Sequence, residues 1–296
     1  VLTPRKAVLW AAFFNFIAFL FFHLSVATTI GSGLVEPHII TPYLLFAALM
    51  GAIIWNLLTW YFGLPSSSSH GLIGGLIGAA LVTGGWHVLN WHGLLPVLIA
   101  IVLSPVLGLS VSWILIKISH ALLKDINSDK AQRWSRRAQF VAGALLSLGH
   151  GGNDAQKTMG IIAVLLFSTG LLNGHFYVPF WVIISCNFVM GLGTLIGGWR
   201  IVNTLGNKIT QLTLLSGGCA ATGAALTLFL ATDLGIPVST THTVTGAILG
   251  VGSSNAWIAT HWPTVRRIMW AWLLTLPAAG LVASLVMILE TPFKLA

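Results

Sequence analysis

The chain has 296 residues, of which 56% are hydrophobic and only 7% are charged, and its formal net charge is +8. Soluble globular proteins carry roughly a quarter charged residues, so this composition cannot build a water-facing exterior and excludes a soluble fold. We expect an all-α, polytopic transmembrane helical bundle, because in lipid the backbone polar groups have to be paired within the spanning segments.

Stretches of about 20 apolar residues are candidate membrane spans, because that length crosses the hydrocarbon core. We expect such spans at 7–26, 42–62, 66–83, 94–118, 138–172, 179–197, 210–231, 236–258 and 267–289. The stretch 138–172 is too long for one plain helix and has a polar, glycine-rich middle at 149–157. This pattern predicts one span that is broken at mid-membrane.

Basic residues are concentrated in the connections on one side of the expected membrane. The segment 117–137 holds six of them, whereas 27–41, 84–93 and 173–178 hold none. Lys and Arg collect in cytoplasmic loops, so we expect 119–137 to be a cytoplasmic basic loop. The same rule explains the positive net charge, and we expect no nucleic-acid partner.

A 15-residue segment occurs twice, at 64–78 and 236–250. At one offset of 172 residues (237 − 65) the copies share a Pro, a His and two Gly, namely Pro65/Pro237, His70/His242, Gly74/Gly246 and Gly78/Gly250. By the loop charges, the first copy follows a span that ends inside and the second follows a span that ends outside. The copies therefore enter the membrane from opposite faces, and inverted repeats with broken helices are typical of secondary transporters.

The repeat divides the chain into a first inverted repeat at 1–118 and a second at 138–296, joined by the basic loop. The polar segment around Asn153 would have its partner 172 residues earlier, upstream of Val1. We therefore expect the full-length protein to carry one more N-terminal span with a similar Asn/Asp motif, which the first repeat of this chain lacks.

Both copies place hydroxyl residues directly after the Pro, where a helix can restart. A restarted helix presents unpaired backbone N–H groups and a partial positive charge at its N-terminus, and such an end suits an oxyanion. We expect substrate contacts from Ser67, Ser68, Ser69, Ser239, Thr240 and Thr241. The alternative is that these small residues only pack helices together, as is common in lipid.

Asp154 is the one acidic residue expected deep in a span, where a carboxylate is costly and points to function. Asn153 beside it can contact substrate or, together with Asp154, hold Na⁺ or carry H⁺. Lys157 can pair with Asp154 or with an anion, and a purely structural ion pair is the alternative. His70 and His242 are either proton carriers or hydrogen-bonded structural residues. These five residues are the expected ion-coupling set.

Catalysis and resident cofactors find no support in the sequence. Ser69 and His70 are adjacent, so their side chains point apart on a helix, and the one intramembrane acid lies elsewhere. His150 and Asp154 would give a metal only two ligands, which is a weak site. No G-x-x-x-x-G-K-[ST] loop occurs, which excludes ATP-driven transport by this chain. We expect no enzyme, no catalytic residues and no resident metal or cofactor.

The segment 149–157, read together with the two Pro-Ser/Thr-His breaks, resembles the inorganic phosphate transporter (PiT) family and its bacterial low-affinity branch in particular. The resemblance covers the whole chain. It implies uptake of inorganic phosphate by symport with H⁺ or Na⁺ through a multi-pass protein of the bacterial inner membrane. In the bacterial branch it also implies phosphate that enters as a neutral complex with a divalent metal.

By matching motif, the resemblance implies that Asn153 and Asp154 serve the ion and phosphate site and that the Ser/Thr residues of both breaks line it. The chain departs from the family at Gly152, where Ala is usual, and in its missing first Asn/Asp motif. The residues alone leave open a transporter of another oxyanion such as sulfate, or a non-transporting receptor or scaffold. Expected partners are inorganic phosphate and membrane lipid, and a homodimer stays open.

Overall fold

The computed structural model describes residues 1–253 and 260–290, and in these residues all regular structure is helical except for one isolated bridge between Val35 and Leu89. Three single turns of 3-10 helix, η1 (Ala18–Leu20), η2 (Pro37–Ile39) and η3 (Trp86–Val88), lie in connections. The α-helices are α1 (Pro4–Ile17), α2 (Ser25–Gly33), α3 (Pro42–Tyr61), α4 (Ser68–Gly84), α5 (Trp91–Leu123), α6 (Ser128–Ser168), α7 (Phe180–Ile196), α8 (Trp199–Asn207), α9 (Leu214–Asp233), α10 (Thr240–Ser253) and α11 (Trp262–Glu290).

Four of the described helices, α3, α5, α9 and α11, are long and apolar enough to cross a membrane. Two bent pairs, α1–α2 and α7–α8, turn by 80° and 72° at short breaks and raise that number to six if each counts as one span. The spans expected at 66–83 and 236–258 need correction, because α4 has 17 residues and the described α10 has 14. Residues 254–258 of the second lie outside the described part of the chain.

The break expected at 149–157 is wrong, because α6 is continuous over 41 residues and includes this segment. Its glycines stay helical because neighbouring elements pack directly on them: a Cβ on Gly151 would lie 2.5 Å from the carbonyl oxygen of Asn15. Its polar side chains find partners on other elements, so the backbone does not need to open. At 1.5 Å per residue α6 is about 60 Å long, roughly twice the hydrocarbon thickness.

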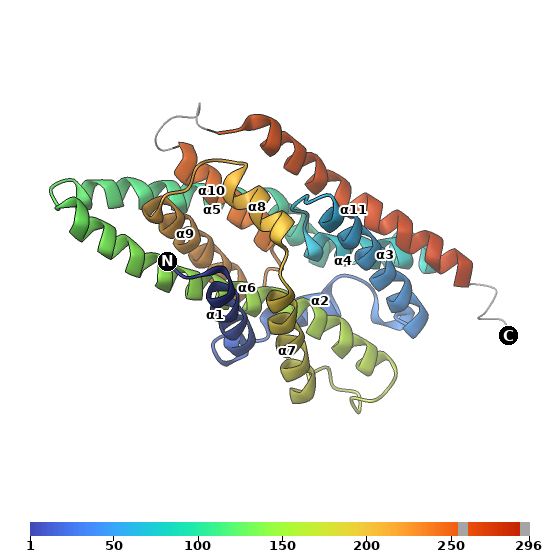
Figure 1. Ribbon diagram of the computed structural model, residues 1–296. Helices are drawn as coiled ribbons and strands as arrows, with labels where there is room; N and C mark the ends of the chain where they lie inside the picture. The colour runs from blue at the N-terminus through green and yellow to red at the C-terminus, as the bar shows by residue number, and fades with distance from the viewer. Residues whose placement is uncertain (254–259, 291–296) are drawn as a thin grey trace.

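The basic segment 119–137, expected to be a loop, is also helical over most of its length. Helix α5 continues to Leu123 and α6 starts at Ser128, so only residues 124–127 connect them. In Figure 1 this turn lies at the left edge, whereas the connections α2–α3 and α6–α7, which carry no Lys or Arg, lie at the right and the lower right. This basic turn and these two uncharged connections therefore lie at opposite ends of this view.

An internal repeat is visible in the order and the length of the helices. Helices α3 and α9 have 20 residues each and start 172 residues apart (214 − 42), and α4 and α10 start at the same offset (240 − 68). Each repeat contains a bent pair, a helical hairpin and a long helix. The hairpins α3–α4 and α9–α10 point their turns toward each other, and both turns reach the C-terminal half of α6.

Each hairpin packs against the long last helix of the other repeat. Helix α4 lies on α11, and α10 lies on α5 (Figure 1). Glycines allow this contact: a Cβ on Gly78 would lie 2.1 Å from the carbonyl oxygen of Gly280, and one on Gly250 would lie 2.2 Å from that of Leu109. The equivalent glycines of the two copies therefore have the same role: each lets its hairpin approach the backbone of a long helix in the other repeat.

The short helices α2 and α8 also reach across the repeats. The Thr29 hydroxyl of α2 donates to the carbonyl oxygen of Gly235 at 2.8 Å, and the Thr204 hydroxyl of α8 donates to that of Gly63 at 3.0 Å. Both glycines have positive φ, near +69° and +63°, and precede the Pro of their hairpin turn. Each turn is thus held by a helix of the opposite repeat.

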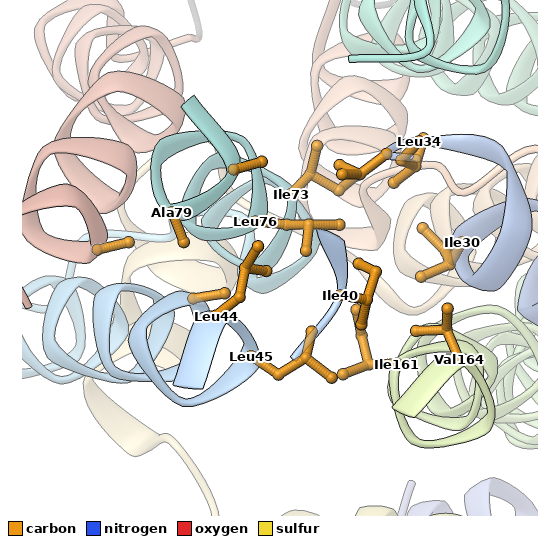
Figure 2. Packing of buried hydrophobic residues seen from close by; sticks show 14 of the residues in the cluster. Ile30, Leu34, Ile40, Leu44, Leu45, Ile73, Leu76, Ala79, Ile161 and Val164 are labelled. Atoms are coloured by element: carbon orange, nitrogen blue, oxygen red, sulfur yellow. The ribbon is translucent and has the colours of Figure 1, made fainter. Parts of the chain in front are cut away.

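The largest cluster of buried apolar residues joins the first hairpin to α2 and α6. Figure 2 shows Leu45 of α3 next to Ile161 of α6, and Leu44 of α3 next to Leu76 of α4. These side chains are at most 4% exposed. The core therefore fixes the first hairpin relative to the C-terminal half of α6.

We expect Gly250→Ala to lower stability, because the added Cβ would collide with a backbone carbonyl of α5 that has no rotamer to change. Overpacking of this kind costs about 1–3 kcal/mol. The measurement is the melting temperature of the purified protein in detergent. The control is Gly143→Ala on α6, where a Cβ meets nothing within 4 Å; equal melting temperatures for the two variants would contradict the packing argument.

Candidate functional site

The two hairpin turns meet at the side chain of Lys157, in the C-terminal half of α6. The ammonium group donates to the Oδ1 atom of Asp154 at 2.5 Å, to the hydroxyl of Ser69 at 2.5 Å and to the carbonyl oxygen of Val238 at 2.6 Å. The side chains of Lys157 and Asp154 are only 3% and 8% exposed. All three ammonium hydrogens thus have acceptors, which a buried charge requires.

The second oxygen of the Asp154 carboxylate extends this cluster to α10 and to α1. Oδ2 accepts the hydroxyl of Thr240 at 3.1 Å and lies 3.2 Å from Nε2 of His150. Nδ1 of His150 is 3.0 Å from Oδ1 of Asn15, whose amide nitrogen donates to the Thr194 hydroxyl at 2.9 Å. A continuous polar chain therefore runs from Lys157 to α7.

A cavity of about 250 Å³ opens beside Lys157 on the side of the first hairpin. Its lining combines hydroxyls, an amide and the ion pair with three apolar side chains: Ala52, Asn56, Ser68, Ser69, Leu72, Asp154, Lys157, Thr158 and Met190. A water molecule occupies about 30 Å³ in the liquid, so a tetrahedral oxyanion fits together with some water. The lining offers hydrogen-bond donors and one buried cation, which is the chemistry an oxyanion needs.

A larger cavity of about 520 Å³ adjoins this one between α6 and α7. The two share Thr158 and Met190, and His150 and Thr194 also line the larger one. Most of its other lining residues are apolar. The buried cluster therefore has a cavity at its Lys157 end and another at its His150 end.

The hydroxyls of the two breaks divide into caps and site residues. Ser67 accepts the backbone N–H of His70 at 3.1 Å, and Ser239 accepts that of His242 at 3.2 Å, so both cap helix N-termini. Ser68 and Ser69 line the smaller cavity, and Thr240 reaches Asp154. Thr241 is half-buried and does not line that cavity.

Asn153 is fully buried and faces away from the smaller cavity. Its amide nitrogen donates to the Thr232 hydroxyl at 2.9 Å and to the Ile236 carbonyl oxygen at 3.3 Å, which orders the turn before α10. Its Oδ1 atom has no partner among the described residues. Its expected roles in substrate and ion binding stay predictions.

The two histidines of the repeat face each other instead of the ion pair. The rings of His70 and His242 meet edge to face with centroids 4.7 Å apart, and His242 stacks on Trp272 at 3.9 Å. The indole N–H of Trp272 donates to the Pro65 carbonyl oxygen at 3.1 Å. Both histidines are at most 1% exposed, so this geometry packs the first turns of α4 and α10 together.

Three site residues were missed by the sequence reasoning. Asn56 and Thr158 line the smaller cavity, and His150 contacts Asp154. The signal for Asn56 was an amide in an otherwise apolar span. His150 was weighed only as a metal ligand, although its i, i+4 spacing to Asp154 also suits an ion pair.

A neighbouring motif residue has a structural role. The Oε1 atom of Gln156 accepts the backbone N–H groups of Val26 and Ala27 at 3.1 and 3.2 Å, and its amide nitrogen donates to the His23 carbonyl oxygen at 2.8 Å. It thereby caps α2. Gly152 makes room for Phe22, since a Cβ there would lie 2.3 Å from that ring.

Comparison with known proteins places this arrangement in a family. Residues 1–283 match the model of the phosphate transporter family. The chain is 57% identical over 285 residues to a protein of Rhizobium meliloti (strain 1021) named probable low-affinity inorganic phosphate transporter, covering 96% of this chain and 85% of that one. It is 42% identical over 282 residues to the protein of the same name from Bacillus subtilis (strain 168), covering 94% and 84%.

A solved structure titled "The sodium-dependent phosphate transporter" is similar over 99% of this chain and 91% of its own, with a TM-score of 0.88 and 27% identity. These relatives are named for transport and not for an enzymatic reaction. The resemblance drawn from the motifs is therefore confirmed. The chain is a multi-pass membrane protein that belongs to the phosphate transporter family.

Proposed function

We propose that this protein takes up inorganic phosphate across the bacterial inner membrane by symport with H⁺ or Na⁺. The observation that carries the proposal is the buried pair of Lys157 and Asp154 beside a hydroxyl-lined cavity, at the point where the two hairpins meet. Secondary transporters hold their substrate in this position, near the midplane between the repeats. The bacterial relatives support both the substrate and the inner membrane.

The charge of the cluster follows from its hydrogen bonds. The Thr194 hydroxyl donates to the Met190 carbonyl oxygen, so its oxygen accepts from the Asn15 amide nitrogen, and the Asn15 carbonyl oxygen faces His150. Nδ1 of His150 therefore carries a hydrogen. Since a carboxylate oxygen only accepts, the 3.2 Å contact between Nε2 of His150 and Oδ2 of Asp154 is favourable when a proton lies between them.

The His150–Asp154 pair is neutral whichever of the two residues holds that proton. The Lys157 ammonium then leaves the cluster with a net charge of +1. A monoanion bound in the adjoining cavity would neutralise it. The lining contains no Arg, so the anion is held by one ammonium and by neutral donors, which permits release.

Binding at this position would act on both hairpins. Lys157 has three N–H groups, and each already bonds to a different acceptor. An oxyanion that accepts one of them takes the place of Ser69, Asp154 or Val238. Where the anion displaces Ser69 or Val238, binding weakens a contact between α6 and a hairpin turn, which links the substrate to the relative position of the repeats.

Two observations bear on the coupling ion. The proton between His150 and Asp154 supports H⁺, because a second cation at Asp154 would compete with His150 and Lys157. The name of the solved relative supports Na⁺. Among the residues that the structure describes, no three His, Cys, Asp or Glu side chains converge on one point. We propose that a divalent metal, where uptake requires one, enters as cargo bound to phosphate.

We expect Asp154→Asn to reduce uptake of labelled phosphate in proteoliposomes strongly, because Lys157 loses its charged partner and His150 its proton acceptor. Leaving one partner of a buried pair alone costs roughly 3–5 kcal/mol, so the melting temperature should fall as well. Asp125→Asn, in the exposed turn after α5, is the matched control and should leave both unchanged.

The double variant Asp154→Asn/Lys157→Met separates transport from structure. It removes both charges, so stability should recover toward that of the unmodified protein while uptake stays low. Uptake at the unmodified level in the double variant would show that the pair is only structural.

We expect phosphate uptake to increase with an imposed inward H⁺ gradient, and His150→Gln to reduce that increase. The reason is that the glutamine side chain cannot exchange the proton that lies against Asp154. Uptake is measured with the pH gradient and the Na⁺ gradient imposed separately. A response to Na⁺ alone would assign the coupling to Na⁺, and indifference to both gradients would remove the symport proposal.

A further inference from the structure

We propose that Asn56 contacts the substrate and selects protonated phosphate over sulfate. This inference rests on the proposed phosphate uptake and adds a residue that determines specificity. Asn56 lies near the end of α3, within a helix that is otherwise almost wholly apolar, and lines the smaller cavity together with Ser68, Ser69 and Lys157.

The Asn56 amide lies against Gly71 in the first turn of α4. The Oδ1 and Nδ2 atoms of Asn56 lie 3.4 and 3.6 Å from the place where a Cβ on Gly71 would be. These distances are ordinary van der Waals contacts, so the amide packs against the first turn of α4. It lines the cavity together with Ser68 and Ser69 of the same turn.

The side chain of Asn56 forms no hydrogen bond to any residue in the described part of the chain. The side chain is only partly buried, so the contents of the cavity can reach the amide. Whatever occupies the cavity supplies its hydrogen-bond partners. The amide thus has unused donors and an unused acceptor directed at the space where the oxyanion fits.

The second repeat shows that the hairpin does not need this amide. At the same offset of 172 (228 − 56) stands Leu228, and Gly71 corresponds to Thr243 (243 − 71). Both are fully buried. The same hairpin thus has a packed leucine in one repeat and an unpaired amide at a cavity in the other. We therefore assign Asn56 a role in binding the ligand of the cavity and not in building the hairpin.

The chemistry of the lining explains why an amide suits phosphate. Lys157 is a donor only, and both oxygens of Asp154 are already taken. Inorganic phosphate keeps at least one P–OH group at neutral pH and needs an acceptor for it, whereas sulfate has no proton to donate. The Asn56 carbonyl accepts from P–OH, and its N–H₂ group donates to a charged oxygen.

The test compares Asn56→Leu, which installs the residue of the second repeat, with the unmodified protein in proteoliposomes. We expect the KM for phosphate to rise about tenfold, the factor that corresponds to 1.4 kcal/mol. The ratio of sulfate to phosphate inhibition constants should fall about as much, since sulfate never used the acceptor. Arsenate, which carries As–OH groups, should keep its ratio to phosphate.

Controls separate this role from damage to the fold. Asn203→Leu, on the exposed face of α8, should change none of these constants. If Asn56→Leu does not fold, the same constants are measured with Asn56→Ala, which removes the amide without adding a bulky side chain. An unchanged KM and an unchanged sulfate ratio in a folded variant would overturn the inference, whereas absence of phosphate uptake by the unmodified protein would instead overturn the proposed function.

Discussion

The ammonium group of Lys157 constrains the whole centre of the protein. A charge in this position is stable only if its hydrogens are all accepted, and the three acceptors come from α6, from α4 and from the turn before α10. This requires α6 to be continuous, so that Asp154 and Lys157 share one face. It also requires both hairpin turns to reach the same point, which two repeats can do from opposite directions only if they are inverted.

The packing of the hairpins explains how their turns reach that point. Gly78 lets α4 approach α11, and Gly250 lets α10 approach α5, to distances that any Cβ would prevent. Thr29 and Thr204 then hold the turn of the opposite repeat. Because each hairpin turn has contacts with the other repeat and with α6, a shift between the repeats changes both turns together. The geometry of the site therefore depends on the relative position of the two repeats.

Local chemistry explains which parts of this arrangement could be predicted from the sequence. Pro and a capping Ser determine where α4 and α10 begin, so their repeat was visible. The same local reasoning failed at 149–157, where glycines and polar residues indicated a break. Partners distant in sequence, among them Asn15 and Thr232, satisfy this segment inside a continuous helix. Asn56 was missed because a single amide in an apolar span, although unusual, belongs to no motif or repeat that would indicate its role.

The two repeats are equal in their caps and their glycines but not in the site. Thr240 uses its hydroxyl to hold Asp154, whereas its counterpart Ser68 (240 − 172) lines the cavity. Likewise Leu228 is packed where Asn56 is unpaired. A symmetric pair of turns would offer an anion two equal positions on either side of Lys157. The turn of the second hairpin uses Thr240 to bind the Asp154 carboxylate, whereas the turn of the first hairpin lines the cavity with Ser68. Among the described residues, the first hairpin therefore offers the anion its position. Lys157 lies between that position and the pair of His150 and Asp154.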